Sequence, residues 1–166
     1  MCLPQSGKSK EPNTACFGLR KEIFSTNFFS VRFHISPLLL LFNKYSCYME
    51  IYKVFRFEAA HFLPNVSETH KCRNMHGHSY KFTIYLQGEV NPQSGWLIDF
   101  HDIKTAVKPL VDELDHQVLN NINGLENPTA ENITIWLWNK IKPLLPQLSK
   151  IHLKETETSG CIYEGK

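Results

Sequence analysis

Hydrophobic and polar residues alternate most clearly in residues 80–87, where every second position is aromatic or aliphatic. A period of two is typical of a strand with one buried face, so this segment predicts a half-buried antiparallel strand. The apolar run at residues 51–60 predicts a strand before it, and residues 96–100 predict a short third strand after it. Residues 151–155 and 161–163, with a Ser-Gly turn between them, predict a final hairpin.

Two helices are predicted between the third strand and the hairpin. Residues 103–114 place apolar side chains three or four positions apart, which indicates an amphipathic helix, and Asp99 can cap its start. Pro109 lies inside this segment, so we expect the helix to kink or to divide in two. Thr129 is a suitable N-cap for the second helix. The apolar face of that helix is formed by Ile133, Trp136, Leu137 and Ile141.

The predicted order is three strands, two helices and two more strands. An antiparallel sheet with both helices packed on one face is an α+β fold. Such a sheet leaves the hydrogen-bonding groups of its edge strands exposed. A chain of 166 residues with 12% aromatic residues gains stability when copies of the same chain cover these edges. We therefore expect a homo-oligomer.

Residues 1–48 differ in charge from the rest of the chain. They hold six Lys or Arg and two Glu, which leaves 12 basic and 14 acidic residues of the total of 18 and 16 for residues 49–166. The excess positive charge therefore lies outside the predicted domain, which shows no nucleic-acid footprint. We expect an N-terminal extension that is poorly ordered or not part of the functional protein, with Met49 as the true start. The alternative is an organellar transit peptide.

Composition disfavours two further classes of protein. The longest apolar patch, residues 37–42, is too short for a membrane helix and lacks the cleavage pattern of a secretory signal. The five cysteines are an odd number without paired spacing, which disfavours a disulfide framework and favours a reducing, cytoplasmic compartment. We expect neither a membrane nor a nucleic acid among the direct partners.

Three histidines indicate a metal site. If the chain is extended from residue 76, His76 and His78 lie on one face of a strand, and His61 closes the strand predicted before it. Antiparallel pairing can bring the three together. Three histidines with one open position are the ligand set of a catalytic zinc site, because a structural site fills the fourth position with protein. For each histidine taken alone, a satisfied surface or core residue is the alternative.

Cys72 lies between Lys71 and Arg73, four residues before His76. The basic neighbours favour the thiolate, so the thiol can act beside a metal without binding it. A lone cysteine is otherwise more often an inert buried thiol. Lys71 and Arg73 are also candidates for holding a phosphate group.

Two carboxylates complete the set of candidate residues. Asp115 precedes His116 at the end of the first predicted helix, where the pair can act as an acid-base unit or serve as a surface helix C-cap. Glu155 lies on the apolar side of its predicted strand, and a buried carboxylate needs partners. A planar ligand edge with two parallel N–H donors, such as that of a pterin, satisfies both oxygens, and a Lys or Arg within the fold is the alternative.

Residues 49–166 resemble the 6-pyruvoyltetrahydropterin synthase superfamily, and within it the carboxy-forming branch of the bacterial queuosine pathway. Three residues separate Cys72 from His76, as in that branch, whereas pyruvoyl-forming animal enzymes have a longer gap. Residues 1–48 have no counterpart. The motifs that carry the resemblance are Phe57-Glu58-Ala59-Ala60-His61, His70-Lys71-Cys72, His76-Gly77-His78-Ser79, Gly95-Trp96-Leu97-Ile98-Asp99-Phe100, Leu114-Asp115-His116, Leu125-Glu126-Asn127-Pro128-Thr129, Lys154-Glu155-Thr156 and Gly160-Cys161-Ile162-Tyr163.

The resemblance implies a tunnelling fold whose subunits assemble into a barrel, as trimers or hexamers, with sites at subunit interfaces. It also implies a role for each candidate residue. The implied roles are Zn²⁺ ligands for His61, His76 and His78, the catalytic thiol for Cys72, the rest of a catalytic triad for Asp115 and His116, and the pterin anchor for Glu155.

The reaction that the resemblance implies is a zinc-dependent lyase reaction. It converts 7,8-dihydroneopterin triphosphate to 6-carboxy-5,6,7,8-tetrahydropterin and releases acetaldehyde and triphosphate. The alternatives are a pyruvoyl-forming or aldolase-like reaction in the same superfamily, a zinc-dependent hydrolase that needs no thiol, and a non-catalytic pterin-binding protein.

Overall fold

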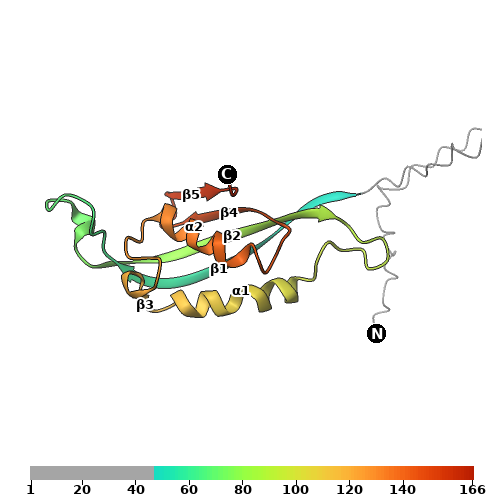
Figure 1. Cartoon of the computed structure of the whole chain (residues 1–166), viewed down its shortest axis with the longest axis horizontal. Helices are drawn as coiled ribbons and strands as arrows, with labels where there is room; N and C mark the ends of the chain where they lie inside the picture. The colour runs from blue at the N-terminus through green and yellow to red at the C-terminus, as the bar shows by residue number, and fades with distance from the viewer. Residues whose placement is uncertain (1–46) are drawn as a thin grey trace, which may run out of the picture. The chain divides into compact units, whose positions relative to one another are not determined.

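A five-stranded sheet with the strand order β3-β1-β2-β4-β5 organises the chain (Figure 1). The structure, a computed structural model, describes residues 47–166. β1 (Tyr48–His61) and β2 (His76–Glu89) form a long antiparallel hairpin and pair along their whole length. The loop between them contains a short 3-10 helix, η2 (Lys71–Arg73). This hairpin contains both of the strands predicted first from the sequence.

The remaining strands flank the hairpin on both sides. β4 (Leu148–Lys154) pairs antiparallel with β2, and β5 (Gly160–Tyr163) pairs antiparallel with β4. β3 (Gln117–Val118) has only two residues and pairs with β1 in parallel, before the short helix η3 (Leu119–Asn121). The sheet is therefore antiparallel except at one edge.

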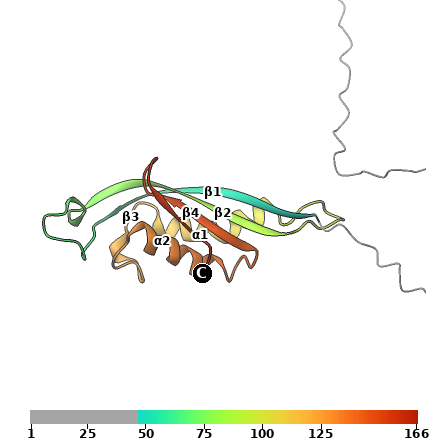
Figure 2. The ribbon, with the colours of Figure 1, turned by 90° about the horizontal axis from the view of Figure 1, so that it is seen from above.

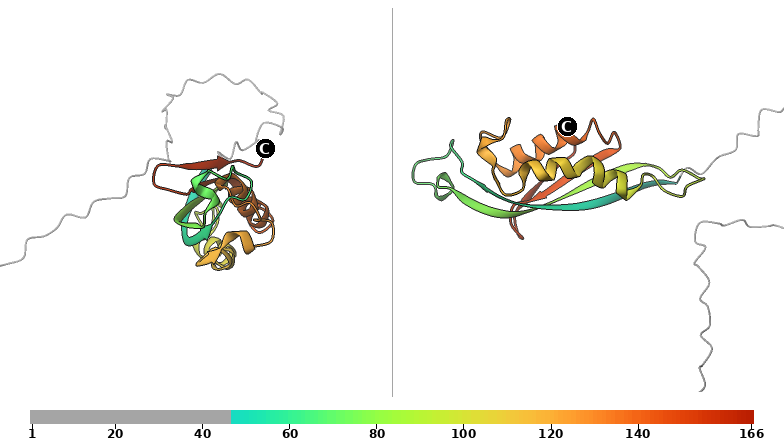
Figure 3. Two further views of the ribbon diagram at one scale, coloured as in Figure 1. Left: turned by 90° about the vertical axis from the view of Figure 1, so that its left-hand side faces the viewer. Right: turned by 90° about the horizontal axis from the view of Figure 1, so that it is seen from below.

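Both α-helices cover the same face of the sheet. α1 (Phe100–Leu114) and α2 (Ala130–Ile141) lie on one side of the strands, and within residues 47–166 no helix covers the other side (Figure 2, Figure 3). This arrangement confirms the predicted α+β fold. No helix in the described part of the chain is long and apolar enough to span a membrane. The predicted extension at residues 1–48 lies outside the described residues, apart from its last two positions.

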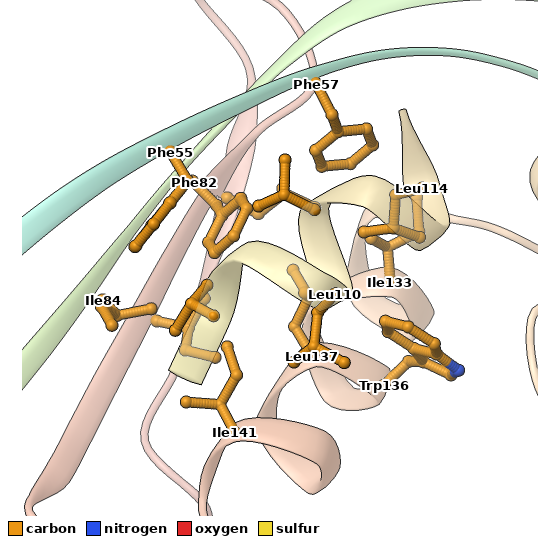
Figure 4. Packing of buried hydrophobic residues seen from close by; sticks show 14 of the residues in the cluster. Phe55, Phe57, Phe82, Ile84, Leu110, Leu114, Ile133, Trp136, Leu137 and Ile141 are labelled. Atoms are coloured by element: carbon orange, nitrogen blue, oxygen red, sulfur yellow. The ribbon is translucent and has the colours of Figure 1, made fainter. Parts of the chain in front are cut away.

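The core fills the space between the sheet and the helices (Figure 4). Aromatic pairs from the hairpin line it: the ring centroids are 5.2 Å apart for Phe55 and Phe82 and 4.8 Å apart for Phe57 and Tyr80. The residues between them along each strand face the opposite side, as the period of two predicts. The helices contribute Ile103, Val107, Leu110, Leu114, Ile133, Leu137 and Ile141.

Residues 96–100 do not form the predicted third strand. The chain bends through residues 95–98, and Asp99 then caps α1 by accepting a hydrogen bond from the backbone N–H of His101 at 2.7 Å. The apolar run is short, and a helix cap at its end outweighs its strand pattern. β3 was not predicted, because two residues cannot show a period.

Pro109 does not divide α1, which is continuous from Phe100 to Leu114. Of the two predicted effects, the division is therefore wrong, and the kink stays a prediction. Pro109 deprives the carbonyl of Thr105 of its helical partner, and both residues are exposed, so water can solvate that carbonyl.

Replacing Pro109 by Ala should therefore stabilise the protein. The substitution restores one helical hydrogen bond and raises the helix propensity at this position, while the unfolded chain gains conformational entropy that offsets part of the effect. We therefore expect the free energy of unfolding to increase by about 1–3 kcal/mol. Urea denaturation at fixed protein concentration measures it, with Lys108→Ala as the exposed neighbouring control. A loss of stability in Pro109→Ala would contradict this account of the helix.

Candidate active site

The three predicted metal ligands meet at one end of the core face of the sheet. His61 of β1 pairs with His76 of β2, and His78 lies two residues further along β2 on the same face. One ring nitrogen of each lies within 4.8 Å of the others. We call these three residues the histidine cluster. The expected antiparallel pairing brings the imidazoles together, and zinc binding by them stays a prediction.

Backbone carbonyls fix the orientation of two of these rings. Nδ1 of His61 lies 2.8 Å from the carbonyl oxygen of Pro128, and Nδ1 of His76 lies 2.8 Å from that of Asn74. A carbonyl oxygen only accepts, so each Nδ1 carries the proton and each Nε2 carries a lone pair. The two Nε2 atoms are 3.1 Å apart. A metal ion between these nitrogens would satisfy both lone pairs, and imidazole nitrogens are ligands that Zn²⁺ accepts, so the histidine cluster could hold that ion.

The surroundings of His61 favour its neutral form, which is the form that binds a metal. Its side chain is 1% exposed. Burial lowers the pKa of His61 and outweighs the hydrogen bond to Pro128, and the neighbouring His76 lowers the pKa further. The buried hydroxyl of Tyr80 lies 3.3 Å from Nδ1 of His61, and burial raises the pKa of that phenol.

Glu155 lies beside the histidine cluster. It directly follows β4, and its Oε1 is 3.6 Å from Nε2 of His61 and 3.8 Å from Nε2 of His78. Among the described residues no Lys or Arg lies within 4.0 Å of this carboxylate, so the alternative of a cationic partner within the fold is not supported. A partly exposed carboxylate beside the cluster is free to accept hydrogen bonds from a ligand.

One cavity joins the thiol, the carboxylate and the histidine cluster. Cys72 lies half-buried in η2 and lines a cavity of about 470 Å³ together with Glu155 and the cluster. The backbone around Cys72 is held on both sides, because its N–H donates to Nδ1 of His70 and its carbonyl accepts from Leu63. The loop therefore places the thiol in the same cavity as the histidine cluster, and its catalytic role stays a prediction.

The two basic neighbours of Cys72 have different surroundings. The guanidinium of Arg73 donates to the carbonyl oxygens of Pro64 at 3.2 Å and Val66 at 3.0 Å, so it braces the loop. Lys71 instead lines the cavity. Of the two candidates for holding a phosphate group, Lys71 is the one beside the site.

The side chains of Asp115 and His116 contact each other at the end of α1. Oδ2 of Asp115 lies 2.9 Å from Nδ1 of His116, and Oδ1 accepts a hydrogen bond from the backbone N–H of Glu58 at 2.8 Å. That bond, and secondly the one from His116, lowers the pKa of Asp115. His116 has a φ of 58°, a conformation that L-residues seldom adopt outside constrained positions. Asp115 is also the C-cap of α1, as the alternative interpretation predicted, and an acid-base role for the pair stays a prediction.

The structure does not bring His116 and Cys72 into one cavity. His116 lines a second cavity of about 430 Å³ with Glu58 and Ser79, whose side chains lie on the face of the hairpin opposite the core. Only His78 lines both cavities. Within one chain, the predicted triad is therefore separated.

Sequence reasoning missed the groups that hold the candidate residues in place. The carbonyls of Pro128 and Asn74 orient two imidazoles, and Thr156 and Ser159 line the cavity beside Glu155. A backbone carbonyl leaves no signature in a sequence. The two hydroxyl residues could have been found from their place in the turn of the final hairpin.

Comparison with known proteins agrees with the fold. A family model described as 6-pyruvoyl tetrahydropterin synthase matches residues 50–166. The chain belongs to the 6-pyruvoyl tetrahydropterin synthase family. The resemblance seen in the motifs is thereby confirmed.

Relatives in this family have different activities. The 6-carboxy-5,6,7,8-tetrahydropterin synthase of Synechocystis is 40% identical over 119 residues, which cover 68% of this chain and 91% of that protein. The dihydroneopterin monophosphate aldolase of Pyrococcus furiosus is 34% identical over 111 residues, covering 65% and 90%. The solved structure of Caenorhabditis elegans 6-pyruvoyl tetrahydropterin synthase matches with a TM-score of 0.68 at 28% identity, covering 73% and 98%. Membership of the family therefore does not select the reaction.

Loss of one imidazole should abolish tight zinc binding. His76→Ala leaves two ligands, so we expect the zinc affinity to fall at least about 100-fold, measured by competition with a chelator. His152→Ala is the matched control, since His152 lies on β4 but faces away from the core. Equal zinc affinity in the two variants would contradict the assignment of the metal site.

Proposed function

We propose that residues 49–166 form a zinc-dependent carbon-carbon lyase. It would convert 7,8-dihydroneopterin triphosphate to 6-carboxy-5,6,7,8-tetrahydropterin, with release of acetaldehyde and triphosphate, in queuosine biosynthesis in the cytoplasm. The observation that carries this proposal is the single cavity shared by the histidine cluster, Cys72 and Glu155. A zinc-dependent hydrolase would need only the metal site. A thiol and a carboxylate in the same cavity favour a reaction in which the carboxylate binds a pterin and the thiol transfers a proton.

Each group in the cavity has a part in this chemistry. Zn²⁺ held by the histidine cluster would supply Lewis acidity for the side-chain hydroxyls of the substrate. Glu155 accepts two N–H groups of the pterin and so fixes the ring. Cys72, as thiolate, takes a proton from the side-chain carbon next to the ring. Lys71 stands where it can contact the phosphate chain.

The second proton requires His116, which faces a different cavity in the same chain. We propose that His116 and Asp115 of a second copy complete the site in a homo-oligomer built from trimers. The imidazole of His116 is 77% exposed in the single chain and is therefore free to reach a neighbouring copy. Asp115 holds the ring and stabilises its charged form.

Two observations favour the carboxy-forming reaction over its relatives. Three residues separate Cys72 from His76, and the relative from Synechocystis, which is 40% identical, is named for that product. The alternative is the pyruvoyl-forming reaction, which uses the same site and keeps all side-chain carbons.

Replacing the thiol should abolish turnover but not metal binding. With dihydroneopterin triphosphate as substrate, we expect Cys72→Ala to lower the rate of acetaldehyde and carboxytetrahydropterin formation by about 10²–10⁴-fold, with unchanged zinc content. Cys47→Ala, which removes an exposed thiol outside the cavity, is the control.

Mass spectrometry of the pterin product separates the alternatives. A 6-pyruvoyl product would show that the protein catalyses the pyruvoyl-forming reaction instead. An active Cys72→Ala variant would favour a zinc-dependent hydrolase. Bound zinc without turnover in the wild type would favour a non-catalytic binding protein.

Mixed oligomers test whether two copies share a site. Co-expressed Cys72→Ala and His116→Ala chains should each be inactive alone, yet about a quarter of the sites in random mixed oligomers should regain both groups if they come from different subunits. Recovered activity, measured on purified two-tag oligomers, supports the shared site. A mixture as inactive as its parents would place both groups in one subunit.

A further inference from the structure

The segment that follows α1 runs beside the end of β1. The carboxylate of Asp115 accepts the N–H of Glu58, and the N–H of His116 donates to the carbonyl of Glu58. β3 continues this ladder with two parallel pairs. In the same register, Asn120 lies opposite Phe62, the first residue after β1.

The side chain of Asn120 extends the ladder after the backbone has turned into η3. Its Oδ1 accepts the N–H of Phe62 at 3.0 Å, and its Nδ2 donates to the carbonyl of Phe62 at 2.8 Å. A primary amide can satisfy a backbone donor and acceptor at once, as a neighbouring strand does. The backbone is therefore held directly after His61.

The same amide also bonds to the loop that orients the His61 ring. Nδ2 of Asn120 donates to the carbonyl of Glu126 at 3.3 Å, and two residues later the carbonyl of Pro128 accepts the proton of Nδ1 of His61. Asn120 thus connects the backbone that carries the ring to the loop that fixes its direction. Its oxygen and both amide protons are used.

We infer that Asn120 is a positioning residue for the metal site, acting on His61 from two sides without contacting the metal. This inference rests on the proposed function, in which His61 binds zinc. Hydrogen-bond partners behind a ligand fix its tautomer and direction, and their loss typically lowers metal affinity 10–100-fold.

Asn120→Asp tests this role most directly. It keeps the size of the side chain and its acceptor oxygen, but it replaces Nδ2 by an oxygen that cannot donate to the carbonyls of Phe62 and Glu126. We expect zinc affinity to fall about 10–100-fold and the visible absorption of the Co²⁺-substituted protein to change in intensity and wavelength. Asn120→Ser, which removes the clash, provides a second variant if Asn120→Asp does not fold.

A readout without metal tests the same point. In the metal-free wild type, ¹⁵N NMR should show His61 protonated at Nδ1, with slow exchange of that proton because Pro128 holds it. In Asn120→Ser we expect faster exchange and a mixture of tautomers.

Trp136→Phe is the matched control. It removes the hydrogen bond from Nε1 of Trp136 to the carbonyl of Asn123 at 3.1 Å, in the same loop but without a bond to β1. We expect a lower Tm with unchanged zinc affinity and Co²⁺ spectrum. If the Asn120 variants behave like this control, Asn120 is merely structural and the inference is wrong. If the wild type binds no zinc, the proposed function fails instead, and the NMR readout alone decides the role of Asn120.

Discussion

The antiparallel register between β1 and β2 is the constraint on which the rest of this structure depends. It places His61 opposite His76 and directs both, with His78, to the face that also carries Phe57 and Tyr80. A shift of one residue would turn every one of these side chains to the other face. The stacked aromatic pairs therefore stabilise the fold and also fix the geometry of the histidine cluster.

The histidine cluster lies at one end of the core, and its polar groups have identifiable partners. Two Nδ1 atoms donate to backbone carbonyls, which leaves the Nε2 atoms of His61 and His76 facing each other at 3.1 Å. Buried polar groups of this kind are expensive to leave unsatisfied. This arrangement could hold a metal ion, and in the proposed function the adjacent carboxylate of Glu155 accepts the N–H donors of the ligand.

Cys72 and His116 line different cavities, and this separation connects the proposed chemistry to self-association. Cys72 lines the cavity of the histidine cluster, whereas His116 lines the other cavity with Glu58 and Ser79. In the proposed function, a second copy of the chain brings these two parts of the site together. The open sheet edges offer the means by which copies can join them.

The sequence by itself determined the two long strands, both helix caps and the identity of the candidate site residues, because periods and capping residues are local signals. It was wrong about a strand at residues 96–100, where a helix cap outweighed the local pattern, and about a division of α1 at Pro109, where the exposed surface tolerates the lost hydrogen bond. Only the tertiary structure decided that Asn120 and Pro128 hold His61. Pro128 lies 67 residues from its partner, and contacts at such separation arise from the fold and not from any local pattern.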